Sequence, residues 1–376
     1  MSKTNDRLTQ PGFLAEVVCP EAGEITAHTA LRGLAALMVI LYHCALASTE
    51  VALGPLTALI RRGYLFVDIF FILSGFILMR RYGASLAHPS REIVRHFWQR
   101  RFLRIYPPYI VWLALATLVW FWIDSRGNGT QHGVGEHLAA ILLHITMLQS
   151  LLALEIQYNV PLWSIAVEMA AYIVLPLFAM AVARTSRMAI GILVVIFLAA
   201  VWLFIQRLGT LDVINGPGAL ARCLMGFCLG ALTSVLAREL PADLARRSRW
   251  MSLCLLILTI LAFTVGQIFL GYCAALGMVM VSSLPTPAPW TRTWLPMLLG
   301  RVSFSLYLAH VPVLSIMIIL LAKLESLSGI PLYSNYVAFA LLVVMASLVV
   351  AVFSWKWVEI GLTARVGAFL GYRPTR

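Results

Sequence analysis

Residues 31–48, LRGLAALMVILYHCALAS, form an apolar run that is long enough to cross a membrane as a helix. Two costly side chains interrupt this run, Arg32 and His43. A helix rises about 1.5 Å and turns about 100° per residue, so the two lie ~16 Å apart on nearly the same face. If Arg32 lies at one membrane surface, His43 lies near the midplane, where an ionisable side chain marks a candidate functional site.

The composition is that of a membrane protein. Of the 376 residues, 61% are hydrophobic and 12% are charged, against about 25% charged in soluble domains. Apolar runs of spanning length recur along nearly the whole chain, and no polar stretch between them is long enough to form a separate core. We therefore predict an all-α integral membrane protein. Its membrane domain covers residues 29–360, between cytoplasmic tails of residues 1–28 and 361–376.

The net charge and the spacing of the cysteines limit which partners and ligands the chain can have. An excess of Lys and Arg that gives a net charge of +12 is typical of polytopic proteins, whose cytoplasmic loops are basic, so we predict no nucleic-acid partner. The six cysteines show neither metal-ligand nor redox spacing. We therefore predict no metal and no disulfide.

Eleven apolar runs are candidate spans, and their number conflicts with the charge pattern. Residues 80–104 carry seven arginines and one acid, which indicates a cytoplasmic segment, but eleven crossings would put the later basic segments outside. A single segment that enters the membrane without crossing it removes the conflict, and residues 137–154 are the candidate because this run is short and the most polar of the set. Such a segment must line a protein cavity. The prediction is a bundle of about ten transmembrane helices with both termini cytoplasmic.

For two of these runs we predict where the helix begins or ends. Residues 105–123 form the third span, and we expect Pro107 in the first turn of its helix, where the missing N–H is no loss. Residues 295–323 form a single late span.

Polar side chains recur at helical spacing inside the later runs. Ser164 and Glu168 are four residues apart, and Ser303, Tyr307 and His310 follow the pattern i, i+4, i+7, so each set shares a helix face. A Ser or Tyr in a span often only bonds a neighbouring helix. An ionisable residue at a helix centre costs ~2.5–3.5 kcal/mol, which favours a function for the buried ones: Arg32, His43, Asp68, Glu168 and His310.

Five motifs occur in a fixed order between about residue 28 and Glu359. They are Arg32 and His43 separated by ten residues, Phe70-Phe71-Ile-Leu-Ser74-Gly75, Arg101-Phe-Leu-Arg104-Ile-Tyr-Pro107, Trp163-Ser164 with Glu168, and Ser303-Phe-Ser-Leu-Tyr307-Leu-Ala-His310. In this order and spacing the chain resembles the acyltransferase family 3 membrane proteins. The resemblance implies a multi-pass protein of the bacterial inner membrane. It would transfer an acyl group, often acetyl, from cytoplasmic acyl-CoA to a carbohydrate or a lipid-linked saccharide, such as an exopolysaccharide or lipopolysaccharide.

The residues themselves suggest roles in that chemistry. Guanidinium groups match phosphates with a planar fork of donors, so we expect the phosphates of CoA to bind Arg32, Arg100, Arg101 and Arg104, although such arginines also contact anionic lipid. His43 is the candidate general base, because an ordinary imidazole accepts a proton near neutral pH. Glu168 and Asp68 are the other candidate catalytic residues. We expect the remaining polar residues of the motifs to line the cavity: Ser74, Trp163, Ser164, Ser303, Tyr307 and His310.

Two alternatives stay open. His43 could act as a nucleophile and carry the acyl group as an acyl-histidine. A proton-coupled transporter is the alternative of another class, because buried His, Asp and Glu residues also form proton relays. Internal repeats are common in transporters, and no convincing repeat occurs in this sequence.

Overall fold

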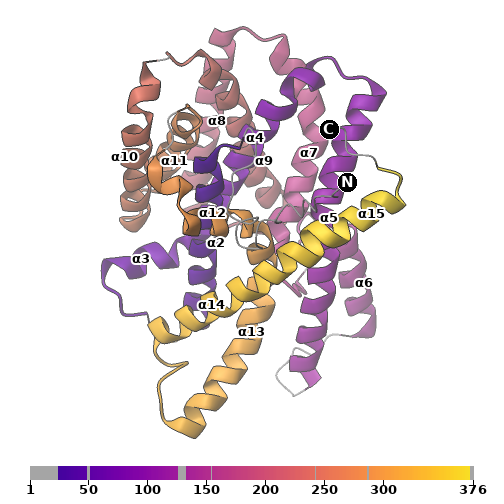
Figure 1. Ribbon diagram of the computed structural model, residues 1–376, viewed down its shortest axis with the longest axis vertical. Helices are drawn as coiled ribbons and strands as arrows, with labels where there is room; N and C mark the ends of the chain where they lie inside the picture. Colours follow the sequence, from indigo (N-terminus) through magenta and orange to yellow (C-terminus); the bar gives the residue numbers. More distant parts are fainter. Residues whose placement is uncertain are drawn as a thin grey trace, which may run out of the picture.

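The computed structural model describes residues 24–48, 51–125, 133–153, 155–241, 243–285 and 288–372. Within these ranges the chain is a bundle of helices without any strand (Figure 1), which confirms the predicted fold class. Nine helical segments of the described ranges are long and apolar enough to cross a membrane. They contain α2 (Thr26–Ala47), α4 (Phe66–Ala87), α5 (Arg91–Ile123), α7 (Leu162–Ala183), α8 (Arg187–Leu208), α9 (Gly216–Leu236), α10 (Leu244–Thr264), α13 (Ser303–Ser328) and α14 (Tyr336–Ser354).

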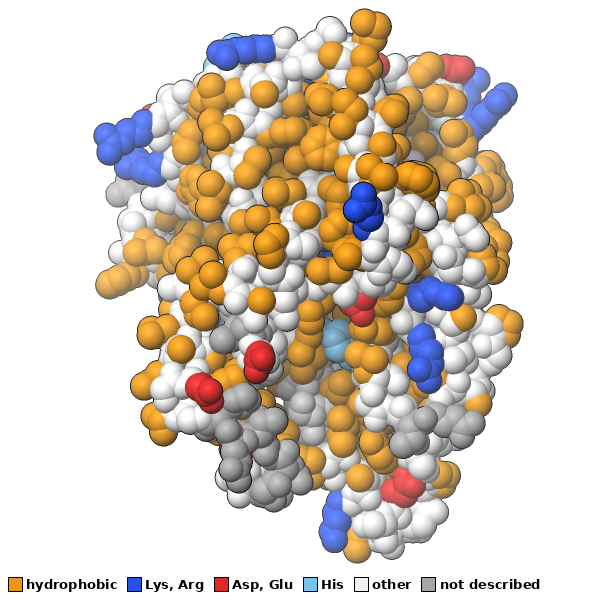
Figure 2. Space-filling view, turned by 180° about the vertical axis from the view of Figure 1, so that it is seen from behind, with side chains coloured by type: hydrophobic (Ala, Val, Ile, Leu, Met, Phe, Trp, Pro, Cys, Tyr) orange, Lys and Arg blue, Asp and Glu red, His pale blue; other side chains and the backbone are white. Residues whose placement is uncertain are grey.

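The outside of the bundle suits a lipid environment. Large apolar side chains are exposed along most of the long helices, including Leu177, Val195 and Leu341. In Figure 2 apolar side chains are spread over the whole face, and the few Lys and Arg side chains lie at its upper corners, on its right half and at its lower end. Exposed apolar surface on this scale identifies a multi-pass membrane protein.

The first and last described segments of the chain lie on the same side of the bundle. Arg32, near the start of α2, lines a cavity together with Arg104 of α5. Arg100, one turn before Arg104, donates to the hydroxyl of Tyr372 at 2.9 Å. The chain therefore crosses the bundle an even number of times between these ends, as the charge pattern predicts.

A short helix supplies the tenth crossing. α11 (Ile268–Ser282) has 15 residues, or ~22 Å, which is less than the ~30 Å of a typical hydrocarbon core. Its neighbours still place it across the bundle. The guanidinium of Arg62 donates to the carbonyls of Phe263 and Thr264 just before α11, and the His28 ring bonds the carbonyl of Val279 near the end of α11.

The predicted non-crossing segment begins as α6 (Val134–Ile145), whose 12 residues make only ~18 Å of helix. The chain then runs through turns, with positive φ at Met147 and Ala153. Buried polar side chains hold this irregular backbone: the amide of Gln149 donates to the carbonyl of Leu162, and that of Asn159 to the carbonyl of Leu308. Irregular backbone is tolerated at membrane depth only where protein groups satisfy it.

Two expected helix boundaries are wrong. α5 runs unbroken from Arg91 to Ile123, so Pro107 and Pro108 lie in its interior and not in a first turn. The run of residues 295–323 is two helices, α12 (Trp294–Arg301) and α13, which meet at Val302. The break places Ser303 at the start of α13.

The centre of the bundle is the contact between α4 and α9. Gly75 of α4 and Gly230 of α9 lie where the backbones touch, and a Cβ at either position would collide with the partner's carbonyl, that of Phe227 or of Ile72. Small residues allow this approach, which is the usual way in which membrane helices pack. The close contact fixes α4, which supplies the largest part of the cavity wall.

The last span ends in a π-helical turn, Trp355–Leu362, followed by α15 (Thr363–Phe369). Such turns often occur at functional sites. Glu359 lies in this turn and is buried, which brings a carboxylate to the side of the bundle where the arginines lie.

Candidate active site

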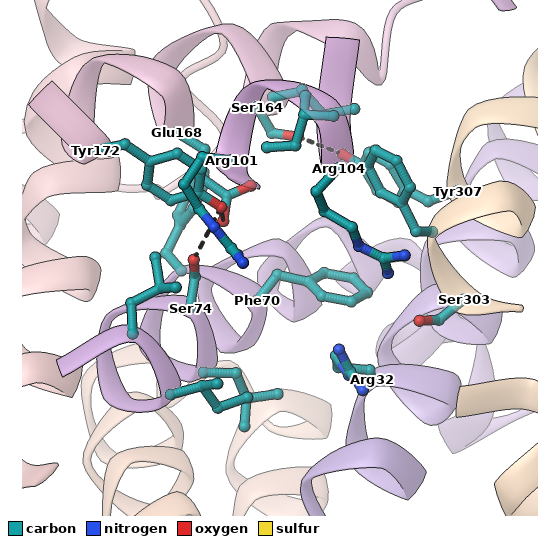
Figure 3. Close-up of a pocket in the computed structure, with 17 residues that line it drawn as sticks. Arg32, Phe70, Ser74, Arg101, Arg104, Ser164, Glu168, Tyr172, Ser303 and Tyr307 are labelled. Carbon is teal, nitrogen blue, oxygen red and sulfur yellow. Dashed lines mark hydrogen bonds between the residues drawn. The ribbon is translucent and has the colours of Figure 1, made fainter. Parts of the chain in front are cut away.

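A cavity of about 160 Å³ lies between α2, α4, α5, α7 and α13 (Figure 3). It gathers eight of the side chains that the sequence predicts for the site, namely Arg32, Ser74, Arg101, Arg104, Ser164, Glu168, Ser303 and Tyr307. The other five do not line it. These are His43, Asp68, Arg100, Trp163 and His310.

Three arginines from two helices face the cavity. Arg101 and Arg104 are three residues apart on one face of α5, and Arg32 reaches in from α2 (Figure 3). Arg104 pairs with Glu359, whose other oxygen accepts from the Ser305 hydroxyl at 2.9 Å. The carboxylate thus holds Arg104 in place.

Within the described ranges, neither of the other two arginines forms an ion pair with a carboxylate. Arg101 donates to the hydroxyl of Tyr82 at 3.4 Å and lies over its ring, and Arg32 donates to the Thr29 hydroxyl at 3.3 Å. The Nε atoms of Arg32 and Arg101 are buried and have no hydrogen-bond partner in the described part of the chain. Buried donors are normally satisfied, so the cavity is prepared for a ligand that brings anionic oxygens.

Glu168 lines the cavity together with two hydroxyl groups, on the same side as Arg101 (Figure 3). Its carboxylate accepts from the Tyr172 hydroxyl at 2.8 Å, and the Ser74 hydroxyl lies 3.4 Å from that of Tyr172. All three side chains line the cavity. Tyr172 was not predicted from the sequence, although it lies four residues after Glu168 on the same face of α7.

Tyr307 and Phe70 line the cavity with their rings. The Tyr307 hydroxyl lies 2.8 Å from that of Ser164, and its ring meets Phe70 at 5.6 Å between centroids. The same Tyr307 ring lies 5.8 Å from the ring of His310, which does not line the cavity. The Tyr307 ring, packed against Phe70, therefore forms a partition between the cavity and His310.

His43 and His310 form a pair behind this partition. Nε2 of His310 lies 3.3 Å from Nδ1 of His43. His310 is fully buried, and its Nδ1 lies 2.8 Å from the Tyr307 carbonyl. Nδ1 of His43 lies 2.9 Å from the carbonyl of Val39.

The two carbonyls decide which nitrogens carry protons. A carbonyl only accepts, so Nδ1 of each neutral ring must be the donor. Nδ1–H of His43 then donates to the Val39 carbonyl at 2.9 Å and is shared with Nε2 of His310 at 3.3 Å, so Nε2 of His43 keeps a free lone pair. Within the described residues this nitrogen has no partner, so it is available to take a proton from a ligand.

Asp68 lies elsewhere, in a buried ion pair. Its two carboxylate oxygens accept from Nε and Nη2 of Arg222 at 3.0 and 2.7 Å, and both side chains are almost fully buried. The Arg222 guanidinium lies 5.2 Å from the Trp163 ring. Asp68 and Trp163 thus belong to a bridge between α4, α7 and α9.

Arg222 was not predicted from the sequence, although the sequence pattern could have identified it. It is a charged residue inside the apolar run of residues 219–236, and Asp68 required a partner of opposite charge. Arg100 was predicted to bind the donor in the cavity, but it does not line the cavity. It bonds His96 and Tyr372 beside it.

The described residues hold no group of three or more His, Cys, Asp or Glu side chains that could bind a metal ion. The ligand-binding groups of the cavity are thus guanidinium, hydroxyl and a single carboxylate. Such a set suits an anionic organic ligand better than a cation.

Comparison with known proteins identifies related chains. A family model described as an acyltransferase domain matches residues 27–356. Acyltransferase MdmB from Streptomyces mycarofaciens is 32% identical over 42% of this chain and 40% of its own length. Peptidoglycan O-acetyltransferase OatA from Listeria monocytogenes is 23% identical over 91% of this chain and 56% of its own length.

The chain spans about half the length of the curated relatives that it matches. No solved structure matches it significantly. The transporter alternative finds no support among these matches.

Proposed function

The chain belongs to the acyltransferase family 3 membrane proteins, and from that premise we propose that it is an O-acyltransferase. It moves an acyl group, most simply acetyl, from acyl-CoA to a hydroxyl group of a cell-surface or exported carbohydrate. The observation that supports this is the convergence of three arginines on one cavity beside a histidine pair. The name of OatA favours a carbohydrate as the acceptor class.

We place the CoA phosphates at the arginine side of the cavity. CoA carries three phosphate groups, and the buried, unpartnered Nε atoms of Arg32 and Arg101 are donors of the kind that phosphate oxygens accept from. Acyl-CoA is made in the cytoplasm, and the basic segment of residues 80–104 is the predicted cytoplasmic one. On this proposal the cavity opens to the cytoplasm, and both termini lie there, in the bacterial inner membrane.

The length of α2 fits a donor that reaches inward from this side. Arg32 and His43 are eleven residues apart, or ~16 Å along the helix, which resembles the reach of the pantetheine arm of CoA. The thioester must pass the Tyr307 ring to arrive at the histidine pair, because this ring lies between the cavity and His310.

His43 acts as the general base. Its Nε2 takes the proton of the acceptor hydroxyl while the hydroxyl oxygen attacks the thioester carbonyl carbon. The C–S bond breaks, the ester forms, and the CoA thiolate leaves with the proton that His43 returns. His310 accepts a hydrogen bond from Nδ1–H of His43 throughout, so it fixes the ring and stabilises the transient imidazolium. A direct nucleophilic role of His43 would use the same free Nε2.

Glu168 and Asp68 take different parts in this scheme. Glu168 lines the cavity with Tyr172 and Ser74, so we keep it as a residue that contacts the donor. Asp68 is saturated by Arg222, so we assign it a positioning role.

The test is to incubate the purified protein with acetyl-CoA labelled in the acetyl group, together with the carbohydrate fraction of the source organism's cell envelope. The proposal requires CoA release and label that becomes ester-linked to carbohydrate, removable by mild alkali. A protein that binds the labelled donor but releases no CoA in the presence of this fraction would contradict it.

A further inference from the structure

A second polar cluster lies beyond the histidine pair. The Tyr42 hydroxyl donates to the Asp212 carboxylate at 2.9 Å, and the Tyr64 hydroxyl lies 3.2 Å from that of Thr210. The Tyr42 ring lies 5.2 Å from His43 and 5.7 Å from Tyr64, between centroids. None of these side chains lines the arginine cavity.

Side chains of this cluster are exposed, whereas the Tyr307 ring separates the arginine cavity from His310. Asp212 is exposed, and Tyr42, His43 and Tyr64 are partly exposed, whereas His310 is fully buried. A ligand can therefore approach His43 from this side without passing the partition of Phe70 and Tyr307.

The buried Asp68–Arg222 ion pair contacts the backbone of both segments that carry the cluster, the one at Tyr64 and the one at Asp212. Nη2 of Arg222 donates to the carbonyl of Tyr64 at 2.9 Å, and Nη1 lies 3.5 Å from the carbonyl of Val213, next to Asp212. The Thr210 hydroxyl accepts from the Asp212 N–H at 2.9 Å. The Asp68–Arg222 pair thus holds the loop of residues 209–215 against the start of α4, which pre-organises the cluster.

The chemistry of the cluster selects its ligand. A carboxylate accepts hydrogen bonds from hydroxyl groups, phenol hydroxyls both donate and accept, and Tyr rings offer an apolar face beside a polar tip. A saccharide presents the same mixture of hydroxyl groups and C–H faces. The carboxylate disfavours an anionic group, in contrast to the three arginines at the other end.

We propose that Tyr42, Tyr64, Thr210 and Asp212 form the acceptor site, which binds an uncharged, hydroxyl-rich part of a saccharide and presents one hydroxyl to Nε2 of His43. This inference rests on the proposed function. Donor and acceptor then enter from opposite ends and meet at the histidine pair, so the acyl group passes through the partition while the saccharide stays on its own side.

The experiment measures initial rates with labelled acetyl-CoA and the envelope carbohydrate fraction, each varied in turn, for wild type, Asp212→Asn and Tyr42→Phe. We expect the half-saturating carbohydrate concentration to rise roughly tenfold in Asp212→Asn, since a charged hydrogen-bond acceptor is lost. The rise should be smaller in Tyr42→Phe. The donor KM should stay within about twofold in both variants.

Tyr336→Phe is the matched control. Its hydroxyl donates to the carbonyl of Leu41, next to Tyr42 in α2, so the variant removes a hydroxyl nearby without touching the cluster. It should leave both constants unchanged.

Unchanged carbohydrate dependence in both Asp212→Asn and Tyr42→Phe, with transfer still measured, would overturn the acceptor site and leave the proposed function standing. So would an equal rise in Tyr336→Phe. Failure of the wild type to transfer label to this fraction would overturn the proposed function itself. Because Asp212 is exposed, its replacement by Asn should preserve the fold, which the unfolding temperature of each purified variant checks.

Discussion

Nε2 of His310 lies 3.3 Å from Nδ1 of His43, and the two rings meet at 61° with their centroids 5.0 Å apart. The carbonyls of Val39 and Tyr307 fix the tautomers of both rings. In the proposed mechanism the pair works as an orienting residue behind a base, the arrangement that hydrolases obtain from a carboxylate and a histidine. Here the orienting group is a neutral ring, which is less costly to bury than a charge.

The first prediction concerns the hydrogen bond in this pair. His310→Phe keeps a ring but removes the acceptor, so we expect kcat to fall about 100-fold with the donor KM unchanged. His310→Gln retains a side-chain acceptor and should lose less than about tenfold. Steady-state rates of acetyl transfer give both constants. Equal losses in Phe and Gln variants would mean that His310 only fills space.

The second prediction concerns Arg32. Arg32→Lys keeps the charge but replaces the planar fork by a point donor, so we expect the donor KM to rise roughly tenfold and the acceptor dependence to stay unchanged. Arg91→Lys, an exposed arginine at the start of α5, is the control and should leave both constants as they are. Lysine reaches a membrane surface as well as arginine does. A wild-type donor KM in Arg32→Lys would therefore assign Arg32 to that surface alone.

The third prediction separates Arg101 from Arg104. Arg101→Ala should raise the donor KM and leave the unfolding temperature nearly unchanged, because Arg101 forms no ion pair with any carboxylate of the described residues. Arg104→Ala leaves Glu359 buried and unpaired, so it should lower the unfolding temperature as well. Thermal unfolding in detergent and donor titration measure the two effects, with exposed Arg95→Ala as control. An unaltered donor KM in Arg101→Ala, in protein that is folded, would remove the arginine cavity from the donor site.

The fourth prediction concerns the ion pair under the proposed acceptor site. Arg222→Ala should destabilise the protein by about 3–5 kcal/mol, because it strands the buried carboxylate of Asp68. The double variant Asp68→Ala with Arg222→Ala should be more stable than Arg222→Ala alone, since no charge is left unpaired. Thermal unfolding compares the single and double variants. A double variant that loses the sum of the two single effects would show that the two side chains act independently.

Much of this architecture was predictable because membrane burial makes polar residues informative. Arg32, Arg101, Arg104 and Glu168 are expensive in a span, and the structure brings all four to one cavity. The non-crossing segment was predictable from its polarity, since unsatisfied backbone cannot face lipid.

Other features could not be read from spacing. The sequence places Arg32 and His43 on one helix face, but only packing places the Tyr307 ring between the cavity and His310. α5 continues through Pro107 and Pro108 because the helix has already started at Arg91, well before the two prolines. The missing N–H groups free the carbonyls of Leu103 and Arg104, beside the cavity.

The loop of residues 209–215 carries too little pattern to be recognised as part of a site. Asp212 can be recognised as part of a site only through its hydrogen bond with Tyr42, which lies 170 positions earlier in the chain. Arg222 lies in an apolar run and follows the same rule that identified Asp68, so pairing every buried charge with one of opposite sign would have found it.

The most direct test of the central claim is the rate of CoA release by His43→Ala in the presence of acetyl-CoA and the envelope carbohydrate fraction. The account predicts that wild type and His88→Ala, which changes an exposed histidine, release CoA at the same rate. His43→Ala should be at least about 10³-fold slower, although it inserts, folds and binds acetyl-CoA with unchanged affinity. A rate close to wild type in folded His43→Ala would contradict the account, because the proton would then have to leave the acceptor by another route.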